Sequence, residues 1–146
     1  MAKSIVIDSS IFISSLISED PNHTISRKFL AAVKKKNRQI IIPMLAVFEI
    51  LHAYFKLCKD MDKTDHLYQT LIDWNIEGTL RVINMEAEAL VYFTAYHHLF
   101  PLKTADTIIA ITAHHFKSVL ISLDKQLLKN SKQHIRAMTP AQFLNS

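Results

Sequence analysis

K-S-I-V-I-D-S-S, residues 3–10, is the stretch that indicates the fold. It is a short run of β-branched side chains that ends at a carboxylate, Asp8, and such runs favour a buried strand. V-L-I-S-L-D, residues 119–124, repeats this pattern and ends at Asp124. Strands buried on both faces are typical of parallel sheets covered by helices. The two stretches therefore predict an α/β protein with acidic side chains at the ends of strands.

Helical and strand patterns alternate along the rest of the chain. We expect strands at residues 3–7, 39–42, 80–83 and 119–123, and a further edge strand near 135–138. We expect helices at residues 11–17, 24–36, 43–58, 64–74, 85–99 and 104–116, and a short one from about residue 125. Short strands separated by helices indicate a parallel sheet between two helical layers. The prediction is a three-layer α/β/α sandwich, with residues 1–146 forming one domain.

Composition excludes several classes of protein. A chain of 146 residues, 49% of them hydrophobic, has the size and apolar content of one globular domain. Its one glycine, Gly78, excludes glycine-rich phosphate-binding loops, which need several glycines for close backbone approach. Its one cysteine, Cys58, excludes an internal disulfide and a cysteine-based zinc site. Nucleotide-binding folds of the P-loop and dinucleotide types are therefore ruled out.

Charge and hydropathy bear on location and partners. The formal net charge of +4 is compatible with a polyanionic partner, although the basic block at Lys34–Arg38 is expected to be a solvated face. Asp8 interrupts the apolar stretch that a signal peptide would need. The longest uncharged segment, Ala89–Leu102, is shorter than the roughly 20 residues that span a bilayer. We therefore expect a cytoplasmic protein without membrane association.

Four acidic residues lie in apolar surroundings, where burial of an ionised carboxylate costs several kcal/mol unless it is compensated. They are Asp8, Glu49, Asp106 and Asp124. N-capping would explain Asp8 and Asp124, and the helix macrodipole would explain Asp106. Glu49 lies inside a helical stretch and has no such structural role. If the four converge at one edge of the sheet, a divalent cation would relieve their repulsion, and oxygen ligands alone select Mg²⁺ or Mn²⁺.

Four segments of the chain resemble the PIN domain, specifically the VapC-like toxin ribonucleases. V-I-D-S-S-I-F-I is similar to the opening motif of the family, and P-M-L-A-V-F-E-I-L is similar to the helix that bears its second acid. K-T-A-D-T-I-I-A-I-T-A and L-I-S-L-D-K-Q-L are similar to its third and fourth motifs. Their order and separation also match. The resemblance covers nearly the whole chain and implies a five-stranded parallel sheet between helices.

The resemblance assigns roles to individual residues. It implies that the four acids form a Mg²⁺ or Mn²⁺ site, with Asp8 and Asp106 as the firmest ligands and Asp124 and Glu49 binding directly or through water. It also places hydroxyl side chains where they would orient the carboxylates or a phosphate, at Ser9, Ser10 and Ser122. Gln126 departs from the family, in which many members carry a second aspartate at this position. Lys103 is a candidate phosphate contact or a solvated lysine at the start of a helix.

The activity implied is endonucleolytic hydrolysis of single-stranded RNA, which leaves a 5′-phosphate. The resemblance also implies a homodimer and an antitoxin protein that blocks the active site. We expect the helical pair within Leu45–Tyr68 to bind this partner, because it has more apolar surface than a small sheet can cover.

Three alternatives stay open. The first is a PIN-type nuclease outside toxin–antitoxin systems. The second is a metal-free interaction module in which the acids cap helices. A receiver-like phosphoacceptor domain fits less well, because only one acid follows the first strand.

Overall fold

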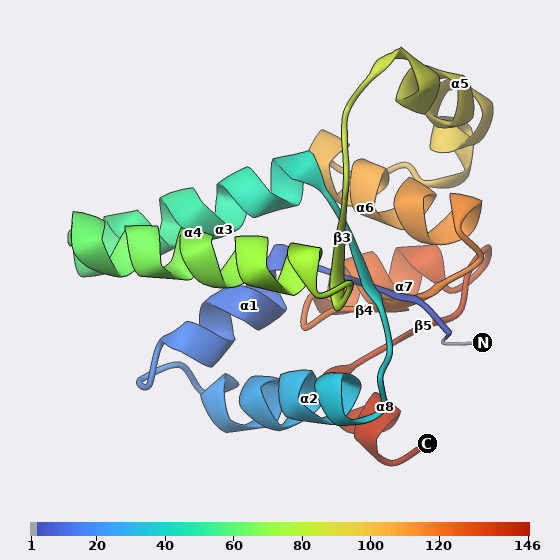
Figure 1. Ribbon diagram of the computed structural model, residues 1–146. Coiled ribbons are helices and arrows are strands. Elements are labelled where there is room, and N and C mark those ends of the chain that lie inside the picture. Colours follow the sequence, from blue (N-terminus) through green and yellow to red (C-terminus); the bar gives the residue numbers. More distant parts are fainter. Residues whose placement is uncertain (1–2) are drawn as a thin grey trace.

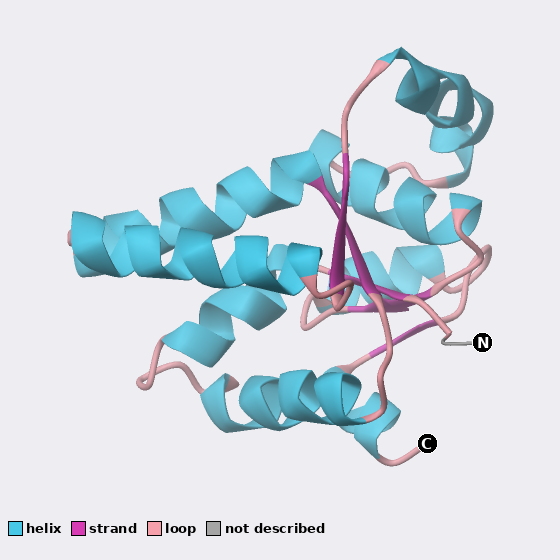
Figure 2. Ribbon diagram, in the orientation of Figure 1, coloured by secondary structure: helices cyan, strands magenta, loops and turns pink. Residues whose placement is uncertain are grey.

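The computed structural model describes residues 3–146, and its centre is a five-stranded parallel sheet (Figure 2). The strands lie in the order β3-β2-β1-β4-β5, so β1 is the central strand. Their bounds are β1 Ile5–Ile7, β2 Ile40–Pro43, β3 Leu80–Ile83, β4 Val119–Ile121 and β5 Ala137–Met138. All four neighbouring pairs are parallel. The prediction of a parallel sheet is confirmed, including its fifth edge strand.

Helices cover both faces of this sheet (Figure 1). Their bounds are α1 Ser9–Leu16, α2 His23–Lys35, α3 Met44–Cys58, α4 Met61–Ile76, α5 Ala87–Tyr96, α6 Thr104–His115, α7 Lys125–Ser131 and α8 Pro140–Leu144, with a 3₁₀ turn at His97–Leu99. Helix α6 packs on β1, β2 and β4 from one face, and α5 packs outside it. Helices α1, α2 and α8 lie on the other face (Figure 1). The three-layer α/β/α prediction is therefore confirmed.

Strands β1 and β2 form where the sequence supplies continuous β-branched residues. Every residue of β1 is buried, and β2 is buried along its whole length. Helix α2 contributes Phe29 and Val33, which are fully buried in the hydrophobic core. A strand enclosed on both faces must be apolar throughout, and this is why these segments lack the alternation of a half-exposed strand. No helix within residues 3–146 combines the length and apolar character needed to cross a membrane.

Several element boundaries differ from the sequence prediction, each for a local reason. Pro43 ends β2 and precedes α3, instead of opening the helix, because its ψ of 148° is extended. Helix α4 begins three residues early, at Met61, because the Asp60 carboxylate accepts a hydrogen bond from the Lys63 N–H and caps it. The helix expected at residues 85–99 shortens to α5 and a 3₁₀ turn, since Glu86 is extended.

The sequence prediction missed helix α8. Thr139 caps this helix in a reciprocal box with Gln142, and Pro140 occupies its first position. The sequence does contain the helix-start motif T-P-A-Q. Helix α8 is only five residues long, however, which is too short to show the apolar periodicity by which longer helices are predicted.

The strand order determines which residues share an edge. Ile7 of β1 pairs with Ile121 of β4, so the chain leaves both strands at the same level. The Asp8 N–H then donates to the Ile121 carbonyl at 3.1 Å. The residues that follow β1 and β4 are thus neighbours, and acidic side chains lie at this edge of the sheet.

Candidate active site at the carboxyl edge of the sheet

Asp8 is the buried centre of the acidic group. It lies just beyond β1 and is 7% exposed. Its Oδ2 atom accepts hydrogen bonds of 2.9 Å from the hydroxyls of Ser10 and Ser122. The Ser9 hydroxyl lies 3.4 Å from Oδ1. The side chain makes no capping bond to α1, so the N-cap explanation does not hold for Asp8. These hydroxyls instead compensate a carboxylate that is almost removed from water.

Glu49 is brought to the same place by α3. Its Oε2 atom accepts a 3.2 Å hydrogen bond from the hydroxyl of Ser9, which also lies beside Asp8. Burial raises the pKa of Glu49, the Ser9 hydrogen bond lowers it, and the charges of Asp8 and Asp106 raise it further. The electrostatic influence of two other carboxylates shows that Glu49 belongs to their group, although 40 residues separate it from Ser9 in the chain.

Asp106 lies in the first turn of α6. Burial raises its pKa, the negative charges of Asp8 and Asp124 raise it further, and the Lys103 ammonium opposes this rise. The start of the helix is fixed by Thr107, whose hydroxyl donates to the Phe100 carbonyl at 3.0 Å. A macrodipole role would favour the charged form of Asp106. The raised pKa indicates that desolvation and neighbouring acids outweigh such a benefit.

Asp124 differs from the other three acids. Its side chain is exposed and caps α7, because Oδ1 accepts from the N–H groups of Gln126 at 2.8 Å and Leu127 at 3.1 Å. The capping explanation therefore holds for this residue. Asp124 also lies close enough to raise the pKa of Asp106. Gln126 contributes its backbone N–H to this arrangement.

Ser122 connects the two strand ends. It is fully buried, donates to Asp8, and accepts a 2.9 Å hydrogen bond from the Asp124 N–H. Of the hydroxyl residues singled out in the sequence, Ser9, Ser10 and Ser122 all contact Asp8. What the sequence did not reveal is that Ser9 also contacts Glu49. A shared hydroxyl links side chains from different elements, and no local pattern encodes it.

The donor set suits a hard divalent cation. All the side-chain atoms gathered here are carboxylate and hydroxyl oxygens, which Mg²⁺ and Mn²⁺ prefer. The raised pKa values of Glu49 and Asp106 indicate negative charge that a cation would stabilise. Within residues 3–146, however, no three acidic, histidine or cysteine side chains already surround one point at metal-binding distance. A cation would therefore have to draw the carboxylates together.

The chain matches one protein family by sequence, and its fold is similar to those of several solved structures. The model of the PIN domain family matches residues 5–133. A toxin–antitoxin complex from Klebsiella pneumoniae contains a chain that is 20% identical, with a TM-score of 0.66 over 93% of this chain and 97% of that one. VapBC-1 from nontypeable Haemophilus influenzae gives 13% identity and a TM-score of 0.67, over 94% and 98% of the two chains.

A third solved structure has the same fold. VapBC2 from Rickettsia felis, bound to a DNA fragment from its promoter, gives 15% identity and a TM-score of 0.61 over 93% of this chain and 98% of that one. At these identities the likeness establishes the fold. No curated protein matches the chain.

Proposed function

Because the chain belongs to the PIN domain family, we propose that it is a Mg²⁺- or Mn²⁺-dependent endoribonuclease acting on single-stranded RNA. The observation that carries the proposal is the grouping of Asp8, Glu49, Asp106 and Asp124 at the carboxyl edge of the sheet. Ligand sites of open parallel sheets lie at this edge. Residues 1–146 form the nuclease as a single domain, and the cytoplasm is its place of action.

Each side chain of the site has a distinct role in this proposal. Asp8 and Asp106 would hold the cation most directly, with Glu49 and Asp124 binding it directly or through water. When bound, the cation would supply polarisation of the scissile phosphate and a lower pKa for water. Ser9, Ser10 and Ser122 fix the carboxylate orientations through their hydrogen bonds. Lys103 would contact the phosphate, and its exposure and its electrostatic influence on Asp106 support this role.

The reaction is hydrolysis of one phosphodiester bond. A water oxygen bonds to phosphorus, the bond from phosphorus to the 3′-oxygen breaks, and that oxygen takes up a proton. The products carry a 3′-hydroxyl and a 5′-phosphate. Burial and neighbouring carboxylates raise the pKa values of Glu49 and Asp106. A positive charge bound at the site would therefore stabilise the ionised forms of both side chains.

Incubation of the purified protein with single-stranded RNA tests the proposal. We expect cleavage with Mg²⁺ or Mn²⁺, none with EDTA, and 5′-phosphates on the mapped downstream ends. The melting temperature should also rise as either cation is titrated, because ligand binding to the folded state stabilises it. Scattered capping carboxylates would show no such rise, so an unchanged melting temperature together with no cleavage would favour the metal-free interaction module.

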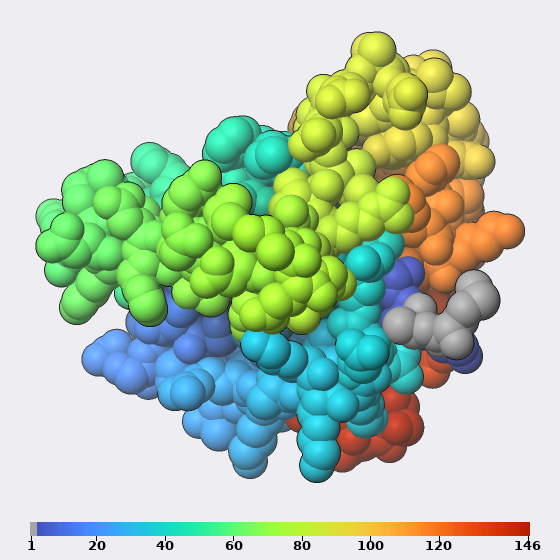
Figure 3. Space-filling view, viewed as in Figure 1, coloured from blue at the N-terminus to red at the C-terminus, as the bar shows by residue number. Residues whose placement is uncertain are grey.

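We further propose that the protein is the toxin of a toxin–antitoxin pair and is a homodimer. The surface that suits an antitoxin is the arm formed by α3 and α4, which projects from the body of the molecule (Figure 3). Phe48, Leu57 and Met61 on this arm are 61%, 62% and 59% exposed. These apolar side chains lie in solvent, whereas Ala46, Val47 and Ile50 make the core contacts of α3. Exposed apolar residues gathered in this way mark interaction surfaces.

Expression in a bacterial host distinguishes a toxin from another PIN-type nuclease. We expect growth arrest on induction, and relief when the protein encoded by the adjacent gene is co-expressed. Alanine at both Leu57 and Met61 should weaken the relief but preserve the arrest, because the two residues lie where α3 ends and α4 begins, about two helical turns beyond Glu49. Normal growth in spite of measurable RNA cleavage would contradict the toxin assignment and leave the nuclease proposal standing.

A further inference from the structure

A basic residue stands one or two positions before four of the five strands. Lys3 precedes β1, Arg38 precedes β2, Lys117 precedes β4 and Arg136 precedes β5. Because the strands are parallel, their amino ends meet at one edge of the sheet. The four bases therefore converge at the edge opposite the carboxylates.

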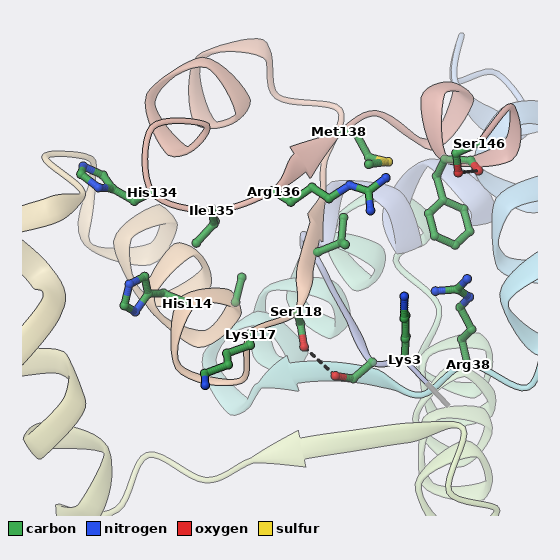
Figure 4. A pocket seen from close by; sticks show the side chains of 14 residues that line it. Lys3, Arg38, His114, Lys117, Ser118, His134, Ile135, Arg136, Met138 and Ser146 are labelled. Atoms are coloured by element: carbon green, nitrogen blue, oxygen red, sulfur yellow. Dashed lines mark hydrogen bonds between the residues drawn. The ribbon is translucent and has the colours of Figure 1, made fainter. Parts of the chain in front are cut away.

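These residues line a hollow with a volume of about 930 Å³. We call it the basic hollow, and its titratable lining residues are Lys3, Arg38, His114, Lys117, His134 and Arg136 (Figure 4). No aspartate or glutamate lines it. The one ion pair found among residues 3–146 joins Lys34 to Glu77 and lies outside it. The positive charge of the basic hollow is thus not neutralised by acidic side chains.

The lining of the basic hollow includes a polar atom without a hydrogen-bond partner among residues 3–146. The Nδ1 atom of His114 is buried and makes no hydrogen bond to any group of residues 3–146. His134 lies close enough to act electrostatically on His114. By contrast, Ser4 and Ser118 beside them satisfy each other through a 2.6 Å hydrogen bond. Buried polar atoms are normally paired, so the hydrogen-bonding capacity of His114 is not fully used within this lining.

The basic and imidazole side chains of the basic hollow are spread out. In Figure 4, Lys3, Arg38 and Arg136 lie toward one side of the basic hollow, and Lys117, His114 and His134 lie toward the other. One phosphate would engage one side only. A chain of phosphates could reach both sides, and several such contacts made together dominate binding to nucleic-acid backbones.

We propose that the basic hollow is a second nucleic-acid site, which binds a single strand through its phosphates. It is separate from the acidic edge and needs no divalent cation. The inference does not depend on the proposed hydrolysis, because the basic hollow shares no side chain with the acidic group.

Binding of a labelled single-stranded decanucleotide, measured by fluorescence anisotropy in EDTA over a range of salt concentrations, tests this proposal. The double variant Lys117→Gln/Arg136→Gln removes two exposed cations from the basic hollow. We expect its affinity to fall at least about tenfold at low salt. The slope of log affinity against log salt should flatten by about 1.4, since each phosphate contact on a single strand contributes about 0.7.

A charge-matched variant controls for net charge. Lys56→Gln/Lys63→Gln removes two exposed cations from α3 and α4, which do not line the basic hollow. It should bind as the wild type does. Equal loss in both double variants would overturn the proposal, because binding would then reflect only overall charge. No binding by the wild type at low salt would overturn it as well.

Two further measurements locate the ligand and identify its source. In imidazole NMR spectra, the oligonucleotide should shift His114 and His134 and leave His52 and His66 of the arm unchanged. Shifts confined to the arm would contradict the assignment. Inorganic tripolyphosphate and ATP should compete only at concentrations well above that of the oligonucleotide, because they carry fewer phosphates. If either binds as tightly as the strand does, the ligand is a small polyphosphate and the nucleic-acid assignment is wrong.

Discussion

Replacing Asp106 with asparagine is expected to reduce RNA cleavage at least about a hundredfold, since changes to the groups that merely orient metal ligands already cost 10–100-fold. The same substitution should not destabilise the fold. Burial and two neighbouring carboxylates raise the pKa of Asp106 in the folded protein, so its charged form is disfavoured there. A neutral amide of the same shape removes that repulsion. The melting temperature in EDTA should therefore stay constant or rise, while its increase with Mg²⁺ should largely disappear.

Asp62 provides the matched control for Asp106. It lies in the first turn of α4, as Asp106 lies in the first turn of α6, but it is exposed on the arm. Asp62→Asn should cleave RNA at the wild-type rate and lose at most the 0.3–1 kcal/mol of a macrodipole interaction. If Asp106→Asn kept full Mg²⁺-dependent activity, Asp106 would have no part in the mechanism. If both variants lost stability equally, Asp106 would be a helix-stabilising residue and nothing more.

Replacing Phe29 with alanine is expected to destabilise the fold by about 3–5 kcal/mol, the range for truncation of a buried aromatic residue. Phe29 of α2 is fully buried and packs edge to face on Phe143 of α8, with ring centroids 5.2 Å apart. The substitution removes both the burial and the aromatic contact that joins α2 to α8. Urea unfolding monitored by circular dichroism should show the loss as a lower midpoint. For a domain with about 5–15 kcal/mol of stability, this is a large share.

Phe48→Ala is the control for this experiment. It removes the same side chain from a position that is 61% exposed, so the unfolding free energy should change by no more than about 0.5 kcal/mol. An equal effect of the two substitutions would mean that Phe29 is not a core residue. Because Phe48 belongs to the arm, this variant also serves the partner experiment without a loss of stability.

Local sequence patterns predicted most of the elements. Runs such as Ile5–Ile7 and Leu80–Ile83 are short, β-branched and bounded by polar residues, and the structure has strands at both. The observed helix boundaries differ from the predicted ones where a single side chain sets them, as at the Asp60 cap of α4. In helix α3, periodicity failed to predict which face is buried. Its apolar residues surround the helix, and periodicity did not reveal that Ala46, Val47 and Ile50 face the core and Phe48 faces solvent.

The sequence by itself determined the α/β class, the acids after β1 and β4, and the lack of glycine-rich phosphate loops. These follow from local composition, because hydrophobic runs and their flanking residues are contiguous in the chain. Only the tertiary structure decided which distant side chains meet. Placing β1 between β2 and β4 lets Ser122 reach Asp8 and lets Ser9 join Asp8 to Glu49. The same order gathers the bases before the strands at the opposite edge. Strand order fixes both edges, and it depends on packing between segments far apart in the sequence, which no local pattern specifies.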